Sequence, residues 1–383
     1  MATAFIMNSR FRLRCALPLH PPYPPLTVSF SRFALFLSSL SQPPSLLEVD
    51  EAVDSFTRML STRPTPRIFQ FNKILGSLAK ANHFPTAISL FHQLQTNGIT
   101  PDLFTLNILM NCCCRMGRMA LAFSVFAKIL RMHYQPDTVT LNTLLKGLCL
   151  FCKVDKALLF HDRLLAHGFQ FDQVTYATLI NGLCKTGLTT AAIQVLRKIP
   201  QYGIVPDVIM YNAIIDSLCK DTLVSHAFHF YSEMLAKGIS PDVITYSTLI
   251  YGLCLVGQLK EAIDLLNHMM LKNIPPNVRT YTTLIDGLCK EGNIKDAKCF
   301  LAIMTKHGVK PNVVTYNSLM DGYCLFNELN KAKHVFNKMT QSGVAPDVRS
   351  YNIMINGFCK CKMVDDALNL FEEMRCKNLV PAR

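Results

Sequence analysis

Residues 313–347 read VVTYNSLMDGYCLFNELNKAKHVFNKMTQSGVAPD, and this stretch determines the fold that we expect. Its apolar residues recur at the i, i+3, i+4, i+7 spacing of one helical face, first in Tyr316, Leu319, Met320 and Tyr323, then in Val335, Phe336 and Met339. Gly343 supplies a helix stop, and Pro346 has no amide hydrogen with which to continue a helix. The stretch therefore predicts two helices joined as a hairpin.

The same pattern recurs every 35 residues, without insertion or deletion. Its nine units begin at Ile68, Leu103, Thr138, Gln173, Val208, Val243, Val278, Val313 and Val348. The twentieth residue of every unit is alanine: Ala87, Ala122, Ala157, Ala192, Ala227, Ala262, Ala297, Ala332 and Ala367. A larger side chain there would force the two helices apart, so we interpret these alanines as packing residues. Proline is the thirty-fourth residue of eight units, and Phe171 replaces it in the third.

A single hairpin cannot bury its apolar faces alone, so neighbouring hairpins must stack. We therefore expect an all-α fold, a right-handed superhelical solenoid of two-helix repeats over residues 68–382, with a concave face built from the first helices. Residues 48–67 contain Ala52, Phe56 and Met59, which match a second helix, and should form a partial capping repeat. No polar capping helix follows Pro381, an ending typical of a short or truncated array.

The composition is that of a folded, basic protein, with 50% hydrophobic and 17% charged residues and a formal net charge of +13. Four of these charges lie in residues 1–47, at Arg10, Arg12, Arg14 and Arg32, which leaves +9 for the remainder. A basic body suits a polyanionic partner, although a large protein can carry such a charge without binding nucleic acid.

The spacing of the 15 cysteines indicates packing rather than disulfides or metal binding. Eight lie at the 35-residue interval in apolar surroundings, where free cysteine serves as a small hydrophobic residue: Cys114, Cys149, Cys184, Cys219, Cys254, Cys289, Cys324 and Cys359. Cys149 and Cys152 form one CxxC without the second pair or nearby histidine that tetrahedral zinc needs. We expect no metal site, no cofactor and a reducing compartment.

Residues 1–47 have the composition of an organellar transit peptide, with four Arg, frequent Ser and Pro, and no Asp, Glu or Lys. Their short apolar run, residues 33–37, comes too late for a secretory signal. We favour the mitochondrion, with the plastid as the alternative. No apolar stretch is long enough to span a membrane, so membrane insertion is not expected.

The 35-residue period, with VVTYNSLMDGYC, VITYSTLIYGLC and PDV at the junctions, resembles the pentatricopeptide repeat family of the pure 35-residue class over residues 68–382. The first units, such as IFQFNKILGSLAK and TVTLNTLLKGLCLF, resemble the plant restorer-of-fertility-like branch. The related tetratricopeptide repeat has 34 residues and a Trp-rich first helix, whereas this chain has no Trp.

The resemblance implies that the fifth and thirty-fifth residues of each unit together read one RNA base. In order, these pairs are Asn72/Asp102, Asn107/Asp137, Asn142/Asp172, Ala177/Asp207, Asn212/Asp242, Ser247/Asn277, Thr282/Asn312, Asn317/Asp347 and Asn352/Ala382. Asn with Asp resembles a uracil reader, and Ser or Thr with Asn an adenine reader. Ala177 departs from the pattern, and Ala382 leaves only a weak pyrimidine preference, so the expected target is near 5′-UUUNUAAUY-3′.

Helix capping is an alternative reason for Asp or Asn at the thirty-fifth place, but it does not explain the polar fifth residue. The second residue of a unit would wedge between bases in the family arrangement, at Val139, Val174, Ile209, Ile244 and Val314, with Arg279 and Arg349 departing from it. Cations for RNA phosphates recur at the thirteenth place: Lys80, Arg115, Lys185, Lys220, Lys290 and Lys360. Complementing the helix dipole is an equally good reason for these cations.

No pattern of catalytic residues stands out. A zinc deaminase would need His-x-Glu, which the sequence lacks, and no carboxylates cluster at matching repeat positions as a nuclease would require. His161 and His268 fall on second helices, where we expect surface or packing roles. The expected function is therefore sequence-specific binding of single-stranded organellar RNA, without enzymatic activity, with any cleavage left to a recruited nuclease or helper protein. The alternative is a scaffold for protein interactions.

Overall fold

The computed structural model describes residues 46–379, which form helices joined by short turns. The first helices of the nine repeats are α3 (Ile68–Lys80), α5 (Leu103–Arg115), α7 (Thr138–Leu150), α9 (Gln173–Lys185), α11 (Val208–Lys220), α13 (Val243–Leu255), α15 (Val278–Lys290), α17 (Val313–Leu325) and α19 (Val348–Lys360). The second helices are α4 (Phe84–Thr96), α6 (Met119–Arg131), α8 (Val154–Ala166), α10 (Thr189–Lys198), α12 (Val224–Ala236), α14 (Leu259–Leu271), α16 (Ile294–Lys306), α18 (Leu329–Gln341) and α20 (Val364–Cys376). A 3-10 helix, η1 (Ile199–Tyr202), extends α10, and α2 (Leu46–Ser61) precedes the repeats. These described residues contain no strand, so the all-α fold is confirmed.

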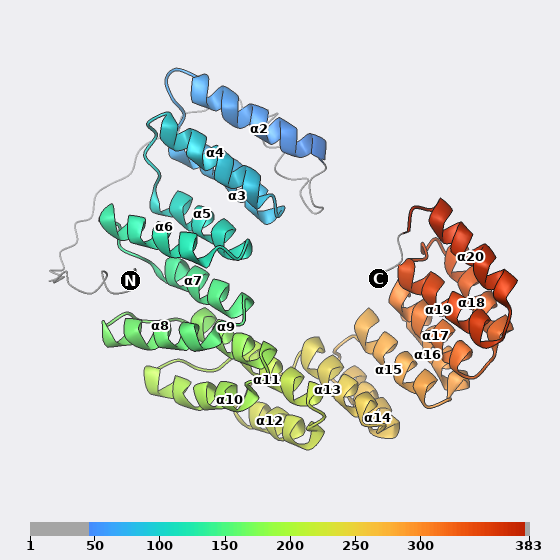
Figure 1. Ribbon diagram of the computed structural model, residues 1–383. Coiled ribbons are helices and arrows are strands. Elements are labelled where there is room, and N and C mark those ends of the chain that lie inside the picture. The colour runs from blue at the N-terminus through green and yellow to red at the C-terminus, as the bar shows by residue number, and fades with distance from the viewer. Residues whose placement is uncertain (1–45, 380–383) are drawn as a thin grey trace. The chain divides into compact units, whose positions relative to one another are not determined.

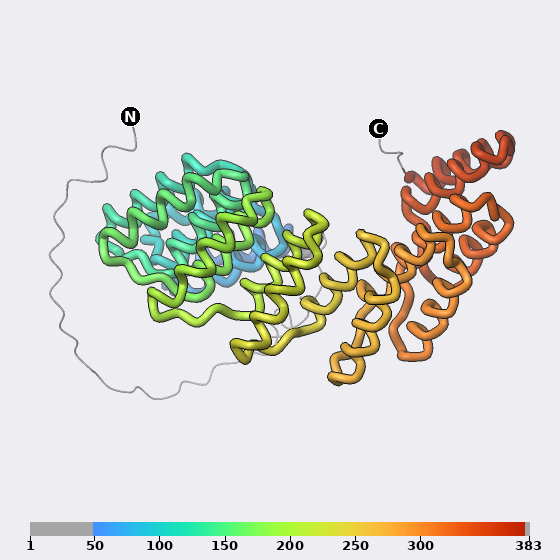
Figure 2. Tube along the Cα trace, turned by 90° about the horizontal axis from the view of Figure 1, so that it is seen from below, coloured from blue at the N-terminus to red at the C-terminus, as the bar shows by residue number. Residues whose placement is uncertain are grey.

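The described helices stack in chain order within two compact units, which divide between residues 179 and 180. In the first unit α5 packs against both α3 and α7, and in the second unit each first helix from α11 to α19 packs against the next (Figure 1). Second helices pack against the first helix of their own repeat, as α6 does with α5 and α16 with α15 (Figure 2). Stacked hairpins therefore build each unit, which is the predicted solenoid arrangement.

Two residues of each repeat, the fifteenth and the thirty-first, have positive φ and end the two helices. In the eighth repeat these are Asn327, with φ 59°, and Gly343, with φ 75°. Cys152 occupies the first of these turns in the third repeat with φ 53°, and it is exposed, whereas Cys149 is buried in α7. The CxxC pair is thus divided between a core position and a turn.

The recurring alanines and cysteines mark close contacts between helices. All nine alanines at the twentieth place are 0–4% exposed. The cysteine at the twelfth place packs against the glycine at the tenth place of the next repeat, where a Cβ on Gly357 would lie 2.7 Å from Sγ of Cys324. Burial raises the pKa of the Cys289 thiol to about 12. Cys184 and Cys254 are partly exposed, and Cys359 is exposed because no further described repeat covers it.

Tyrosine at the fourth place ties the first helix to the second. The hydroxyl of Tyr211 donates to Glu233 of α12 at 2.8 Å, and that of Tyr351 donates to Glu373 of α20 at 2.9 Å. Tyr281 pairs instead with His307 at 2.6 Å. These bonds satisfy phenol groups whose rings are buried between the helices.

The start of the array is covered by α2, which packs against α3 and α4. Phe56 is fully buried, and its ring centroid lies 5.1 Å from that of Phe71 in an edge-to-face contact. Helix α2 begins at Leu46, two residues before the predicted boundary at 48. Residues 1–45, on which most of the predicted transit peptide falls, lie outside the described residues.

The third repeat adapts to the loss of its junction proline. Phe171 is buried, and its ring stacks on His161 with centroids 4.7 Å apart. Burial lowers the pKa of His161, although the hydrogen bond to Asp162 and the charge of Asp162 raise it and offset part of this effect. His161 is therefore a packing residue, one of the two roles expected for it. None of the helices described for the chain is both long and apolar enough to cross a membrane.

Candidate nucleic-acid interface

The fifth and thirty-fifth residues of a repeat meet at the start of the next first helix, beside that helix's third residue. Nδ2 of Asn212 donates to Oδ1 of Asp242 at 3.0 Å. The hydroxyl of Thr245 donates to Oδ1 of Asn212 at 2.6 Å and lies 3.0 Å from Oδ1 of Asp242. Asp242 also accepts from the backbone N–H of Thr245 at 2.9 Å and thereby caps α13. We call the fifth residue, the thirty-fifth residue and the following third residue a junction triad.

Four more junctions repeat this Asn–Asp geometry. The distance from Nδ2 of the asparagine to Oδ1 of the aspartate is 3.0–3.5 Å, and that from the third-place hydroxyl to the asparagine Oδ1 is 2.6–2.9 Å. The triads are Asn72/Asp102/Thr105, Asn107/Asp137/Thr140, Asn142/Asp172/Thr175 and Asn317/Asp347/Ser350. The structure therefore places the two side chains of each of these pairs side by side, and it adds a third member that the sequence did not reveal.

Two junctions carry a hydroxyl at the fifth place and asparagine at the thirty-fifth. Oγ of Ser247 lies 2.7 Å from Oγ1 of Thr280, and Oδ1 of Asn277 accepts from the Thr280 backbone N–H at 3.0 Å. Because Oδ1 of Asn277 accepts the capping hydrogen bond, the Nδ2 group of this amide lies on the side away from that bond. Thr282, Asn312 and Thr315 repeat this arrangement.

The two pairs that depart from the family pattern also differ in structure. Ala177 is half-buried and offers no polar atom, while Asp207 still caps α11 by accepting from the Met210 backbone N–H at 3.0 Å. Asn352 is exposed, unlike the fifth residues of the other repeats, and its predicted partner Ala382 lies outside the described residues.

An exposed apolar side chain stands at the second place of seven repeats, one turn or less from the triads. The predicted residues Val139, Val174, Ile209, Ile244 and Val314 are 45–60% exposed, and Phe69 and Phe104 reach 62% and 61%. Arg279 and Arg349 are exposed as well. The two phenylalanines were missed in the sequence because the pattern sought there was aliphatic; aromatic rings can also stack on bases.

All six cations at the thirteenth place are exposed, but they differ in their partners. Lys220 pairs with Asp216 and Lys290 with Asp286, each four residues earlier on its own helix. Arg115 lies 3.4 Å from Oδ1 of Asn82. Lys80, Lys185 and Lys360 complete the set at the ends of α3, α9 and α19.

Comparison with known proteins identifies the repeat. The model described as PPR repeat family matches residues 66–115, 101–150, 206–255, 252–290, 281–325, 311–360 and 346–381. The models described as Pentatricopeptide repeat domain and PPR repeat match residues 159–221 and 139–169. The chain belongs to the pentatricopeptide repeat family.

Individual pentatricopeptide repeat proteins resemble it over different lengths. A mitochondrial member from Arabidopsis thaliana is 45% identical over 51 residues, 13% of this chain and 8% of the relative. Another from the same plant is 36% identical over 72 residues, 18% of this chain and 14% of the relative. The crystal structure of PPR10 in complex with an 18-nt psaJ RNA element superposes with a TM-score of 0.68 at 23% identity, covering 91% of this chain and 53% of that one.

Three of the thirty-fifth-place aspartates of this pentatricopeptide repeat protein, Asp102, Asp172 and Asp347, are held as carboxylates. Burial raises the pKa of Asp102, but hydrogen bonds from the hydroxyl and backbone of Thr105 and from Asn72 outweigh it and lower the pKa below 3.8. The pKa values of Asp172 and Asp347 are lowered in the same way, by their third-place hydroxyl and backbone N–H and by the asparagine amide. An ionised carboxylate can only accept hydrogen bonds, which defines what each triad can recognise.

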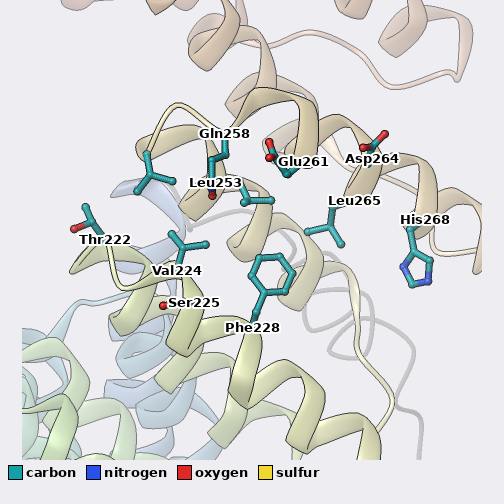
Figure 3. A pocket seen from close by; sticks show the side chains of 11 residues that line it. Thr222, Val224, Ser225, Phe228, Leu253, Gln258, Glu261, Asp264, Leu265 and His268 are labelled. Atoms are coloured by element: carbon teal, nitrogen blue, oxygen red, sulfur yellow. The ribbon is translucent and has the colours of Figure 1, made fainter.

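Other candidate sites lie apart from the triads. An open cavity of about 760 Å³ is lined by residues of α12, α13 and α14, among them Phe228, Leu253 and Leu265 (Figure 3). Leu253 is near the C-terminal end of α13, whereas Asp242 and Ser247 are at its start. Within residues 46–379 no three His, Cys, Asp or Glu side chains are grouped so that they could hold a metal ion.

Proposed function

We propose that this pentatricopeptide repeat protein binds single-stranded RNA in a sequence-specific manner, with one base per repeat. The observation that carries the proposal is the junction triad, which brings the fifth and thirty-fifth side chains together at seven repeats in two chemically distinct versions. PPR10, a structural relative, has been crystallised with RNA, which supports the same class of ligand here.

The two versions of the triad would prefer different bases because they present opposite hydrogen-bonding groups. At Asp137, Asp172, Asp242 and Asp347, the triad bonds described for the chain all fall on Oδ1, so Oδ2 is available to accept a ring N–H. Uracil and guanine carry such a donor. At Asn277 and Asn312, Nδ2 would instead donate to a ring nitrogen of adenine or cytosine.

The fifth residue would then separate pyrimidines from purines. Nδ2 of asparagine donates one hydrogen to the aspartate and keeps the second, which suits the carbonyl oxygen of a pyrimidine. Asn–Asp repeats would read uracil and Ser–Asn or Thr–Asn repeats adenine, giving a target near 5′-UUUNUAAUY-3′. The exposed second residues, from Phe69 to Val314, would pack between neighbouring bases, and the cations at the thirteenth place would follow the phosphates.

We further propose that the RNA is an organellar transcript whose processing, stability or expression depends on this protein. The first repeats resemble the restorer-of-fertility-like branch of the pure 35-residue class, and the name of one relative places that relative in mitochondria. The mitochondrion is therefore our preferred location and the plastid the alternative. Cleavage of the RNA would come from a recruited nuclease or helper protein.

Selection from a randomised RNA library tests the proposal. The purified chain should enrich U-rich sequences that contain UAA, and sequencing of the bound fraction gives the motif directly. A bound fraction with the same composition as the input would contradict base reading.

The competing function is a scaffold for protein interactions, because stacked helical hairpins expose long surfaces. Crosslinking in isolated organelles, followed by sequencing of bound RNA and mass spectrometry of bound proteins, separates the two. RNA binding predicts reads that centre on sites matching the selected motif. A scaffold predicts protein partners that remain bound after ribonuclease treatment, without such reads.

A further inference from the structure

One residue of the junction triad has no role in the proposed base reading, although it touches the side chains that would read. Seven repeats with a polar fifth residue are followed by a hydroxyl at the next third place: Thr105, Thr140, Thr175, Thr245, Thr280, Thr315 and Ser350. Each hydroxyl lies 2.6–2.9 Å from the fifth side chain of the preceding repeat. All seven are fully buried.

Helix capping accounts for only part of this hydroxyl's bonding. At α13, α15, α17 and α19 the hydroxyl also accepts from the N-cap backbone N–H and so completes a capping box. At α5 and α7 it bonds the fifth side chain without a capping box, and one junction caps its helix with no hydroxyl at all. The third residue of α11 is Met210, and its backbone N–H still donates to Oδ1 of Asp207 at 3.0 Å. Met210 is also fully buried, so an apolar side chain fits the same place. Neither the cap nor the packing requires a hydroxyl there.

The hydroxyl instead accompanies the fifth residue of the preceding repeat. Each of the seven stands 33 residues after an Asn, Ser or Thr, whereas Met210 stands 33 residues after Ala177. Gln70 occupies the third place of the first repeat, which follows no complete repeat. The chain thus carries the hydroxyl where a polar fifth side chain precedes it and omits it where none does.

The hydrogen bonds of the hydroxyl explain why it accompanies a polar fifth residue. An asparagine amide has an acceptor end and a donor end that can exchange by rotation about one bond. At Asn212 the hydroxyl of Thr245 donates to the acceptor end at 2.6 Å, the shorter of its contacts with Asn212 and Asp242, while the donor end of the amide faces the carboxylate of Asp242. Rotation would turn Oδ1 toward that carboxylate, so the amide is held with its remaining N–H available to a base.

Where the fifth residue is serine, the third-place hydroxyl would leave the fifth side chain as a hydrogen-bond acceptor toward the base, whereas asparagine is left as a donor. Oδ1 of Asn277 can only accept, and the Thr280 hydroxyl lies 3.1 Å from it. When Thr280 donates to Asn277, Ser247 donates to Thr280, and the lone pairs of Ser247 are left to accept from a base amino group. Adenine carries such a group.

We propose that the third-place hydroxyl is a positioning residue for base reading: it holds the fifth side chain of the preceding repeat in one orientation and so strengthens the choice between pyrimidine and purine that this side chain makes. The inference rests on the proposed function, since it assumes that the fifth side chain meets a base. It adds a residue from the following repeat to each base-reading site.

Thr245→Val tests the inference at the fifth nucleotide. Binding is measured by fluorescence anisotropy with 5′-UUUUUAAUU-3′ and with the same RNA carrying G or C at nucleotide 5. We expect the wild-type preference for U over G to fall about tenfold in Thr245→Val, because a buried acceptor loses its partner and the amide is released. The preference for U over C, which Asp242 would set, and that for A over G at nucleotide 6 should change much less.

Two variants serve as controls. Thr245→Ser keeps the hydroxyl, as Ser350 does naturally, and should keep the wild-type preference for U over G. Ser350→Ala removes a single oxygen and repeats the test at nucleotide 8 if Thr245→Val does not fold.

The outcomes separate the inference from the proposed function. A wild-type protein that prefers U over G, with Thr245→Val and Ser350→Ala retaining the full preference, overturns the inference and leaves the function standing. An equal loss of affinity for every RNA in the variants means that the hydroxyl is merely structural, which also overturns the inference. A wild-type protein that does not distinguish these RNAs overturns both.

Discussion

The aspartate or asparagine at the thirty-fifth place can serve as a helix cap and as a base reader because the two roles use different atoms. Oδ1 of Asp347 accepts from the backbone N–H of Ser350 at 2.8 Å, which is an N-cap contact. The second oxygen of the same carboxylate is left for another donor. Capping, which could explain the residue type from sequence alone, is therefore present and compatible with base reading.

Exchanging the pair in the seventh repeat should change the base that it selects. Thr282→Asn combined with Asn312→Asp builds the Asn–Asp version of the triad, with Thr315 already in place. We expect the preferred seventh nucleotide to change from A to U, by roughly tenfold in relative affinity, because donor and acceptor positions are exchanged. Competition binding with RNAs that differ only at nucleotide 7 measures the change, and nucleotide 6 is the internal control. An unchanged preference for A would show that these residues do not read a base.

The lowered pKa of Asp102 predicts how stability depends on pH. A carboxyl group whose pKa is lower in the folded state than in the unfolded state stabilises the folded protein. This contribution is complete at pH values above the unfolded-state pKa, about 3.9, and is lost as the pH falls through the folded-state pKa. Asp102→Asn keeps an N-cap, as Asn277 does, but cannot ionise. We expect the wild type to be more stable than Asp102→Asn by about 0.5 kcal/mol at pH 6, after solvent screening, and the difference to shrink below pH 4. Urea unfolding at several pH values measures the difference, and a gap that widens toward acid would contradict the assignment.

At the scale of the helix, the contact between cysteine and glycine fixes how closely successive first helices approach. Gly357 lies against Cys324, with Sγ 2.7 Å and Cβ 3.5 Å from the position that a Cβ would take. Alanine normally favours a helix over glycine by about 1 kcal/mol, but here the clash should dominate. We expect Gly357→Ala to destabilise the protein by about 1–3 kcal/mol.

A double-mutant cycle isolates that contact. Cys324→Ala removes the sulfur, which is the closest atom, and leaves Cδ1 of Leu329 at 3.1 Å and Cβ of residue 324 at 3.5 Å from the new methyl group. Because the end of the leucine side chain can shift by a few tenths of an ångström, Cys324→Ala should recover part of the stability that Gly357→Ala removes. Gly76→Ala is the matched control, since the nearest atom to its Cβ would be 3.8 Å away, and it should be neutral or stabilising. Additive effects of Gly357→Ala and Cys324→Ala in thermal unfolding would rule out the contact as the cause.

The sequence predicted the helices and the packing residues because both depend on local periodicity. The alanine at the twentieth place and the cysteine at the twelfth were identified by their spacing alone, and both pack between helices. The partners of those residues were not predicted, because Cys324 meets Gly357 across 33 residues and no local pattern links them. Thr245 was missed for the same reason: its position in VITY suggests only a helix start, and its bond to Asn212 is visible only when two repeats are stacked.

At the scale of the whole molecule, the net charge of +13 suits a polyanion but does not say where the polyanion lies. The thirteenth-place cations offer one path for an RNA backbone, but a cation near a helix C-terminus also stabilises the helix dipole. Lys220 and Lys290 are already paired with Asp216 and Asp286, whereas Lys80, Lys185 and Lys360 have no ion pair with any described residue. The unpaired lysines are therefore the better candidates for phosphate contacts.

Replacing two of the three unpaired lysines, Lys185 and Lys360, should weaken RNA binding without changing base preference. Neutralising one cation that binds a phosphate of single-stranded RNA lowers the slope of log affinity against log salt by about 0.7, so Lys185→Ala with Lys360→Ala should lower it by up to about 1.4. Lys220→Ala with Lys290→Ala is the matched control and should have a smaller effect, because the partner carboxylates already offset those charges. Titrations of the predicted target between about 50 and 200 mM salt give the slopes. If the slope is unchanged and only the unfolding temperature falls, the lysines stabilise the helix ends, and the RNA backbone must follow other cations of the chain.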